Sequence, residues 1–281
     1  RMTARPMDIA PARPVRLPDS GLGSGWEGRA ILGLTLLLLS LGLVTLYSAS
    51  SVLAMRQGSP DTYYVLRQAA GAVGGLAAMI GCALTPYKRW ERWSWPLLWV
   101  SVVTLVVIIL PGTEAIAPEI NGARRWLQIG LTIQPSDFAK ISVIVWTAAM
   151  AVKKAPHFDS LRNGLGPFFV VWSLVLIPIA LEPDLSTAVL IGILGVMVVF
   201  AAGARIAHFV FLGLLVVPVF LNQLAVGFRQ DRIDAYLNPA LDPAGAGFQL
   251  RQSLVALGSG GLTGVGFGEG RQKFGFLPEA H

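Results

Sequence analysis

The sequence predicts an all-α, polytopic integral membrane protein. Of its 281 residues, 54% are hydrophobic and only 14% are charged, and the mean hydropathy is +0.62. Soluble domains carry about 25% charged residues, so a shortfall of this size along the chain favours a protein that crosses a lipid bilayer. Long apolar runs recur between short polar segments, as successive membrane-spanning helices require.

Seven apolar runs reach about 17 residues or more, the lower limit for a helix that spans a bilayer. They are Ala30–Tyr47, Val65–Leu84, Trp95–Pro111, Ser136–Val152, Leu165–Leu181, Leu185–Ala202 and Ala207–Val226. The first run is longer than the apolar core of a signal peptide, about 7–15 residues, and we interpret it as an uncleaved span. Trp90, Trp93, Trp95 and Trp99 cluster around one boundary, as interfacial aromatic side chains do.

Lys and Arg are concentrated in alternate loops, and this bias predicts the orientation. The more basic segments contain Arg1, Arg5, Arg13, Arg16 and Arg29, then Lys88, Arg89 and Arg92, then Lys153, Lys154 and Arg162, then Arg205. The intervening loops contain Arg56, then Arg124 and Arg125, then no basic residue. Because Lys and Arg mark cytoplasmic loops, we expect a cytoplasmic N-terminus. The predicted organisation is a disordered basic tail (1–29), a seven-span transmembrane domain (30–226) and a large extracytoplasmic loop (227–281).

The net charge and the numbers of cysteines and histidines argue against nucleic-acid binding, a disulfide framework and a Cys/His metal site. The net charge of +6 follows the loop bias, so it is weak evidence for nucleic-acid binding. Cys82 is the single cysteine and forms no intrachain disulfide. The three histidines, His157, His208 and His281, lie far apart in the sequence, and no Cys/His cluster has metal-ligand spacing.

The stretch "NGARRWLQIGLTIQPSDFAK", residues 121–140, links the third and fourth runs on the predicted outer side. Pro135 suits the first position of a helix, and Asp137 and Lys140 would then share a helix face. Lys140 is either a functional group within the membrane or half of an internal ion pair that locks helices together. Arg124 and Arg125 are interpreted either as contacts to lipid headgroups or as a phosphate clamp.

Two short motifs have simple structural interpretations. In "EPDLSTA", residues 182–188, Asp184 is a natural N-cap for the sixth apolar helix. The glycine-rich stretch at 258–270 lacks the strand and helix of a nucleotide-binding loop, and we interpret it as a flexible loop beside a substrate.

The predicted outer loop contains a short turn, a short helix and several polar candidate residues. We expect a turn at Asp231–Leu237 that Asn238-Pro239 stops, and a surface helix at Phe248–Leu257 that Gly258 ends. Asp242, which precedes a proline, either caps a turn or is catalytic. Glu279 and His281 lie two residues apart and either perform acid–base work or form an ordinary polar chain end.

Taken together, these motifs resemble the SEDS family, the FtsW/RodA membrane proteins of bacterial cell-wall synthesis. The matching segments are "NGARRWLQIGLTIQPSDFAK", "EPDLSTAVL", "DPAGAGFQLRQSLVALGSGGLTGVGFG" and "QKFGFLPEAH", in the family's order across residues 30–281. "GFQLRQSL" and "LPEAH" look more like the division member, FtsW. The family's usual "QPSE" has Asp137 in place of its Glu here, and its usual "QPDLGT" has Glu182 and Ser186. Since the family has ten spans, we expect this chain to be a fragment of that fold.

The resemblance implies a peptidoglycan glycosyltransferase that joins lipid II units on the outer face of the inner membrane at the division septum and releases undecaprenyl pyrophosphate. By motif match Asp242 is its catalytic residue, acting as a general base. Residues expected to contact substrate are Arg124, Arg125, Lys140, Asp137, Gln134, Gln249, Glu279 and His281.

Expected partners are lipid II, the nascent glycan strand, membrane lipids, a class B penicillin-binding protein and divisome subunits, with no nucleic acid. No cofactor is assigned; Mg²⁺ or Mn²⁺ would assist at the pyrophosphate, although the sequence shows no dedicated carboxylate cage. The alternatives are a flippase or transporter for a lipid-linked precursor, and a non-catalytic scaffold for a transpeptidase.

Overall fold

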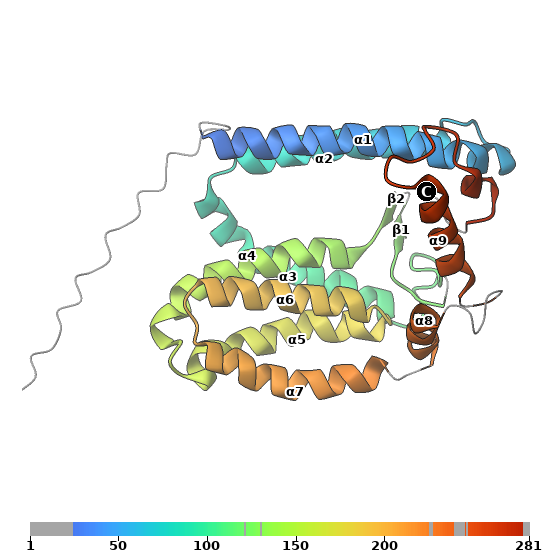
Figure 1. Ribbon diagram of the computed structural model, residues 1–281. Coiled ribbons are helices and arrows are strands. Elements are labelled where there is room, and N and C mark those ends of the chain that lie inside the picture. Colours follow the sequence, from blue (N-terminus) through green and yellow to red (C-terminus); the bar gives the residue numbers. More distant parts are fainter. Residues whose placement is uncertain are drawn as a thin grey trace, which may run out of the picture. The chain divides into compact units, whose positions relative to one another are not determined.

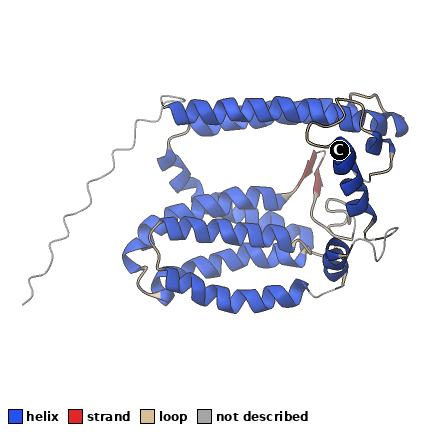
Figure 2. Cartoon of the chain, viewed as in Figure 1, coloured by secondary structure: helices blue, strands red, loops and turns tan. Residues whose placement is uncertain are grey.

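A computed structural model describes residues 25–120, 122–129, 131–224, 227–238, 245 and 247–277. The chain is mostly helical, as predicted (Figure 2). By packing it divides into two compact units: the first joins the residues up to Pro86 with those from Ala256 onward, and the second is Tyr87–Val255. This division concerns packing, whereas the predicted boundaries at 29 and 226 concern membrane topology. The predicted N-terminal tail falls almost entirely outside the described residues.

Each of the seven apolar runs coincides with a helix (Figure 1). The helices are α1 (Trp26–Arg56), α2 (Tyr63–Leu84), α3 (Tyr87–Ile109), α4 (Pro135–Lys154), α5 (Gly166–Leu181), α6 (Leu185–Ala201) and α7 (Ile206–Leu224). Helix α1 has 31 residues and extends beyond its apolar run at both ends. Helix α3 starts eight residues before the predicted run, so its tryptophans lie on the helix itself. Both helices extend into polar flanking residues, because the backbone hydrogen bonds of a helix do not require apolar side chains.

Four helical segments of the described chain are long and apolar enough to cross a membrane. They are α1, α2, α3 and Leu161–Leu181, while α6 and the stretch Ile206–Asn222 are apolar but shorter. Helix α4 is not among them, and it carries Asp137 and Lys140 near its start and two lysines at its end. The chain is therefore an all-α membrane protein with several spans, and the number seven stays a prediction.

In the first unit, helices α1 and α2 pack together, and a short 3₁₀ helix, η3 (Arg271–Phe274), packs on α1. Lys273 donates to the backbone carbonyls of Ser48 (3.3 Å) and Gly268 (2.6 Å), and the Gly268 amide donates to the Ser48 hydroxyl (2.8 Å). Gly266 and Gly268 have φ angles of +106° and +81°, which favour glycine. The end of the predicted flexible glycine-rich loop is therefore attached to α1.

The core of the second unit lies among helices α3, α4, α5 and α6. Trp146, Phe168 and Trp172 are among its largest aromatic side chains, and each is at most 4% exposed. Gly195 of α6 lets that helix approach the Trp172 ring, because an added Cβ would lie 2.7 Å from it. The Trp172 indole also donates to Thr147 (3.0 Å), so a polar contact fixes the same ring. This packing fixes the positions of these helices relative to one another.

A loop of residues 110–134, here called the α3–α4 loop, contains a feature that was not predicted. Strands β1 (Leu127–Ile129) and β2 (Leu131–Ile133) pair in antiparallel register, with Leu127 opposite Ile133. The described part of the fold is all-α apart from this short hairpin. Each strand has only three residues, too few for an alternating pattern to stand out from the apolar background.

The turn and the helix predicted after the seventh run both lie within helices of the structure. Helix α8 (Phe228–Leu237) ends before Asn238, as expected. Helix α9 (Phe248–Gly260) begins where predicted but continues two residues past Gly258, since a glycine costs a helix only about 1 kcal/mol. Two other elements connect α4 to α5: a 3₁₀ turn, η1 (Ala155–His157), and a π-helical turn, η2 (Leu161–Leu165).

Candidate functional site

One end of the second unit contains a pocket of about 540 Å³ between the α3–α4 loop and the turn that joins α5 to α6. This volume is within the range of small-molecule sites, about 300–1,000 Å³. Its polar lining residues are Glu114, Glu119, Arg124 and Glu182. Its remaining lining residues are Ile109, Pro111, Gly122, Ala123, Leu181 and Pro183.

Arg125 links the α3–α4 loop to the α5–α6 turn, the two segments on either side of this pocket. Its Nε donates to the backbone carbonyl of Glu182 (3.1 Å), and its Nη2 donates to that of Pro183 (2.8 Å). Both acceptors lie in the α5–α6 turn, more than fifty residues away in sequence. In this arrangement the guanidinium is occupied by backbone oxygens, so its contacts favour a positioning role.

A second link between the walls uses Gln134 and Asp184. The Gln134 side-chain amide donates to Asp184 Oδ2 (3.2 Å). Asp184 Oδ1 accepts from the Thr187 amide (3.3 Å), which confirms Asp184 as the N-cap of α6. One carboxylate therefore fixes both the start of the helix and its distance from the α3–α4 loop.

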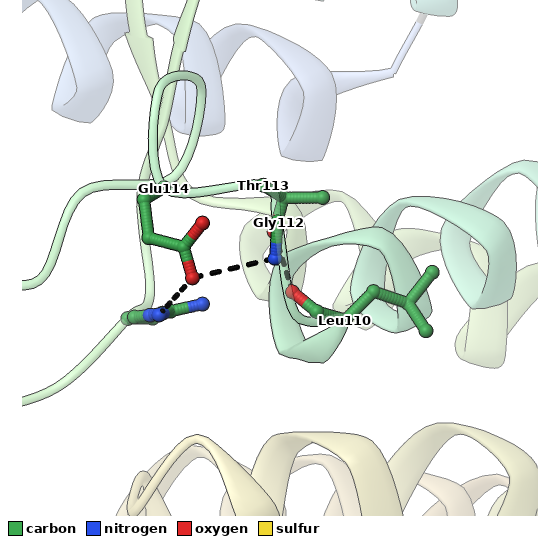
Figure 3. Close-up of polar contacts among 5 residues, drawn as sticks. Leu110, Gly112, Thr113 and Glu114 are labelled. Atoms are coloured by element: carbon green, nitrogen blue, oxygen red, sulfur yellow. Dashed lines mark hydrogen bonds and ion pairs between the residues drawn. The ribbon is translucent and has the colours of Figure 1, made fainter.

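Arg124, the neighbouring arginine, forms an ion pair with Glu114 at 2.6 Å. Figure 3 shows Glu114 also accepting from the Gly112 amide (3.3 Å), and the Thr113 hydroxyl donating to the Leu110 carbonyl (2.8 Å). Hydrogen bonds from its own amide, Arg124 and the Gly112 amide lower the pKa of Glu114. Glu114 is thus ionised and neutralises Arg124 at the pocket.

Glu182 is the least expected member of the site. The residue is 2% exposed, and neither carboxyl oxygen has a hydrogen-bond partner. Burial, with the nearby charge of Asp184, raises the pKa of Glu182 to about 8, although Arg125 opposes the shift. At neutral pH the group is therefore mainly a neutral carboxylic acid. In the sequence, Glu182 departs from a family motif and fits a polar path across the membrane in the transporter alternative. A carboxyl in so short a turn between two apolar helices was the signal for a place in this site.

Asp137 and Lys140 form the ion pair that their spacing predicted. The Lys140 ammonium lies 2.6 Å from Asp137 Oδ1, across the first turn of α4. The Lys140 side chain is 30% exposed and that of Asp137 is 63% exposed. The pair lies near the start of α4, the same helix end that Gln134 precedes.

Of the predicted residues, Arg124 lines the pocket, and Arg125 and Gln134 contact the α5–α6 turn beside it. Asp137 and Lys140 lie on the adjoining helix. Gln249 is exposed on α9, and its backbone carbonyl accepts from the Ser253 hydroxyl (2.8 Å). The other three predicted residues, Asp242, Glu279 and His281, lie outside the described residues. Within the described part of the chain, no three His, Cys, Asp or Glu side chains are grouped so that they could hold a metal ion.

The fold and the polar helix ends define a membrane protein with several spans and a site at one end of its helices. A family model described as "Cell cycle protein", for FtsW, RodA and SpoVE, matches residues 29–281. The chain therefore belongs to the FtsW/RodA/SpoVE family.

Similar curated proteins include two from different bacteria. The probable peptidoglycan glycosyltransferase FtsW of Trichlorobacter lovleyi is 36% identical over 272 residues, covering 96% of this chain and 68% of that protein. Stage V sporulation protein E of Bacillus subtilis is 41% identical over 249 residues, covering 88% of this chain and 67% of that protein. The chain thus spans about two thirds of the length of these relatives.

Two solved structures are similar in fold. A chain of a peptidoglycan synthase complex, described as coordinating polymerization and crosslinking, matches with a TM-score of 0.63 and 27% identity, over 83% of this chain and 66% of that one. The rod-shape determining protein RodA of Thermus thermophilus matches with a TM-score of 0.50 and 24% identity, over 67% of this chain and 58% of that one. The second likeness supports the fold alone.

The raised pKa of Glu182 predicts a specific pH dependence of stability. Between about pH 4.5 and pH 8 the folded state holds a proton that the unfolded state releases. Unfolding free energy should therefore fall by about 1.4 kcal/mol per pH unit as pH rises through this window, and level off above it. The Glu182→Gln variant lacks this contribution. Thermal unfolding in detergent across the window should show wild type losing stability relative to Glu182→Gln, and parallel curves would contradict the buried neutral acid.

Proposed function

We propose that this chain is a peptidoglycan glycosyltransferase, which joins lipid II disaccharide units into glycan strands and releases undecaprenyl pyrophosphate. The observation that carries the proposal is 36% identity over 96% of the chain to a relative named as a probable peptidoglycan glycosyltransferase. Other relatives with the same name are 35–39% identical over 87–89% of the chain. The FtsW name of these relatives supports a role in cell division at the septum of the inner membrane.

The proposed topology has seven spans and a cytoplasmic N-terminus. Alternate crossing would then place the α3–α4 loop, the α5–α6 turn and the residues after α7 on the outer face. The pocket supports this arrangement, because the first two of these connections meet at one end of the second unit. Lipid-linked sugars on the outer face would meet the polar helix ends there, and the apolar helices would contact the lipid tail.

In the proposed reaction, Asp242 takes the proton from the 4-hydroxyl of the acceptor sugar. The resulting oxygen forms a bond to the anomeric carbon of the donor sugar, and the bond from that carbon to the pyrophosphate oxygen breaks. The electron pair leaves with undecaprenyl pyrophosphate, and Asp242 later gives its proton to solvent. Positive charge from Arg124 and Lys140 stabilises the leaving group, once these side chains exchange Glu114 and Asp137 for phosphate oxygens.

The other predicted residues have supporting roles in this proposal. Arg125 and Gln134 hold the α5–α6 turn through the contacts described above, and Asp137 holds Lys140 in position until substrate arrives. Gln249, Glu279 and His281 are proposed to contact substrate from the outer loop. A divalent cation is given no step, because the described carboxylates form no metal-binding group.

The proposed partners are a class B penicillin-binding protein and divisome subunits. Similarity to a chain of a peptidoglycan synthase complex supports such an assembly. A flippase and a non-catalytic scaffold remain the alternative functions: a flippase would move lipid II without joining sugars, and a scaffold would tolerate loss of Asp242.

The first test replaces Asp242 by Asn in the full-length protein. Loss of the general base should lower lipid II polymerisation by about a hundredfold or more, while the protein folds normally. Asp231→Asn, an exposed aspartate on α8, is the matched control and should keep its activity. Both variants are assayed with and without the transpeptidase partner, and full polymerisation by Asp242→Asn would exclude the proposed base.

The second test concerns the positive charges. Replacing both Arg124 and Lys140 by Ala should weaken binding of undecaprenyl pyrophosphate at least about tenfold, because charge-assisted hydrogen bonds to phosphate are lost. Lys153→Ala, at the other end of α4, removes a charge that pairs with Glu91 and should bind normally. Unchanged affinity in the double variant would rule out the pyrophosphate role.

A further inference from the structure

Glu182 is one of the residues around the pocket, and its buried carboxyl has no hydrogen-bond partner among the described residues. It is almost fully buried, and both of its oxygens are unsatisfied. A buried polar group in this state costs about 1–3 kcal/mol, and in a native structure it calls for a specific explanation. A ligand that enters the pocket and supplies hydrogen bonds would recover this cost.

The lining of the pocket selects among possible ligand groups. The lining residues include three glutamates, Glu114, Glu119 and Glu182, and one arginine, Arg124. A phosphate group beside Glu182 is therefore disfavoured. A metal ion is disfavoured as well, since the described residues offer no group of three ligands.

An apolar ligand fits no better, because it would leave Glu182 unsatisfied. What remains is a neutral, amphipathic ligand with several hydroxyl groups. Its polar edge would meet the carboxyl, and its carbon skeleton would lie against the apolar lining, which includes Pro111, Leu181 and Pro183. A sugar ring has this chemistry.

We propose that Glu182 and the pocket around it bind the saccharide portion of the lipid-linked substrate, with the carboxylic acid of Glu182 accepting a hydrogen bond from one sugar hydroxyl and donating one to another. This assignment rests on the proposed function for the identity of the substrate. Sugar and pyrophosphate are directly bonded in that substrate, so Arg124 and Glu182, which line the same pocket, would contact adjacent parts of one molecule.

The turn that carries Glu182 is fixed before any ligand arrives. Arg125 holds the backbone carbonyl of Glu182 itself, and Gln134 holds Asp184 two residues later. The carboxyl therefore loses little conformational freedom on binding, which is the advantage of a preorganised site. Arg125 is a positioning residue in this scheme.

The experiment measures two affinities of the full-length protein in nanodiscs, with lipid II and with undecaprenyl pyrophosphate as probes. The two probes share the lipid and the pyrophosphate, and only lipid II carries the disaccharide with its stem peptide. Glu182→Ala should weaken lipid II binding about tenfold, as expected for the loss of hydrogen bonds in a buried site, and leave undecaprenyl pyrophosphate binding unchanged. Glu182→Gln retains a donor and an acceptor and should stay within about threefold of wild type. Glu91→Gln, on α3, is the exposed control.

Three results would overturn the subsite. They are unchanged lipid II binding by Glu182→Ala, equal losses for both probes, and a Glu182→Gln variant as weak as Glu182→Ala, which would indicate recognition of a cation by charge. Should Glu182→Ala fail to fold, Leu181→Trp provides the test: it narrows the pocket from an exposed position on its wall and should weaken lipid II binding selectively. Equal affinities for wild type and Leu181→Trp would then reject the proposal.

Polymerisation by the unmodified protein separates this inference from the proposed function. If lipid II is bound as predicted but not polymerised, the glycosyltransferase proposal fails while the sugar subsite stands. If lipid II is polymerised but Glu182→Ala binds both probes like wild type, the subsite fails while the glycosyltransferase proposal stands.

Discussion

The pair of hydrogen bonds from Arg125 to the α5–α6 turn holds the site together. The acceptors are the backbone carbonyls of Glu182 and Pro183, and the donor comes from the α3–α4 loop, which also contains the short hairpin. A planar guanidinium with several donors suits two adjacent carbonyls in a way that a lysine ammonium does not. With this contact in place, the loop and the turn face each other across the pocket.

The same contact explains how an acid tolerates burial at position 182. Arg125 is directed at the backbone of the turn, so it moderates the pKa of Glu182 without forming an ion pair with the carboxyl. Asp184 takes the hydrogen bonds from Gln134 and the Thr187 amide and favours the neutral form of its neighbour. The family motif that this chain resembles usually has a glutamine at this position. A neutral Glu182 can donate and accept hydrogen bonds, as that glutamine can. The substitution thus preserves a donor and an acceptor in the pocket.

Sequence patterns predicted the local features well because their causes are local. Apolar runs marked all seven helices, Pro135 marked the start of α4, Asp184 marked a cap, and the spacing of Asp137 and Lys140 predicted their ion pair. The Arg125 contact spans 57 positions and leaves no periodic signal, so neither it nor the pocket was predicted. Asp242 lies outside the described residues. Its proposed catalytic role rests on the motif resemblance and on the predicted orientation.

A double-mutant cycle between Arg125 and Glu182, read out as lipid II affinity, tests the central claim most directly. Arg125→Lys keeps the charge but cannot donate to both carbonyls in the same geometry. If Arg125 acts by placing Glu182, then Arg125→Lys with Glu182→Ala should bind lipid II no more weakly than the weaker single variant, because both changes remove one interaction. Undecaprenyl pyrophosphate binding should be unaffected throughout. Fully additive losses of lipid II affinity, or equal losses for both lipids, would contradict the account.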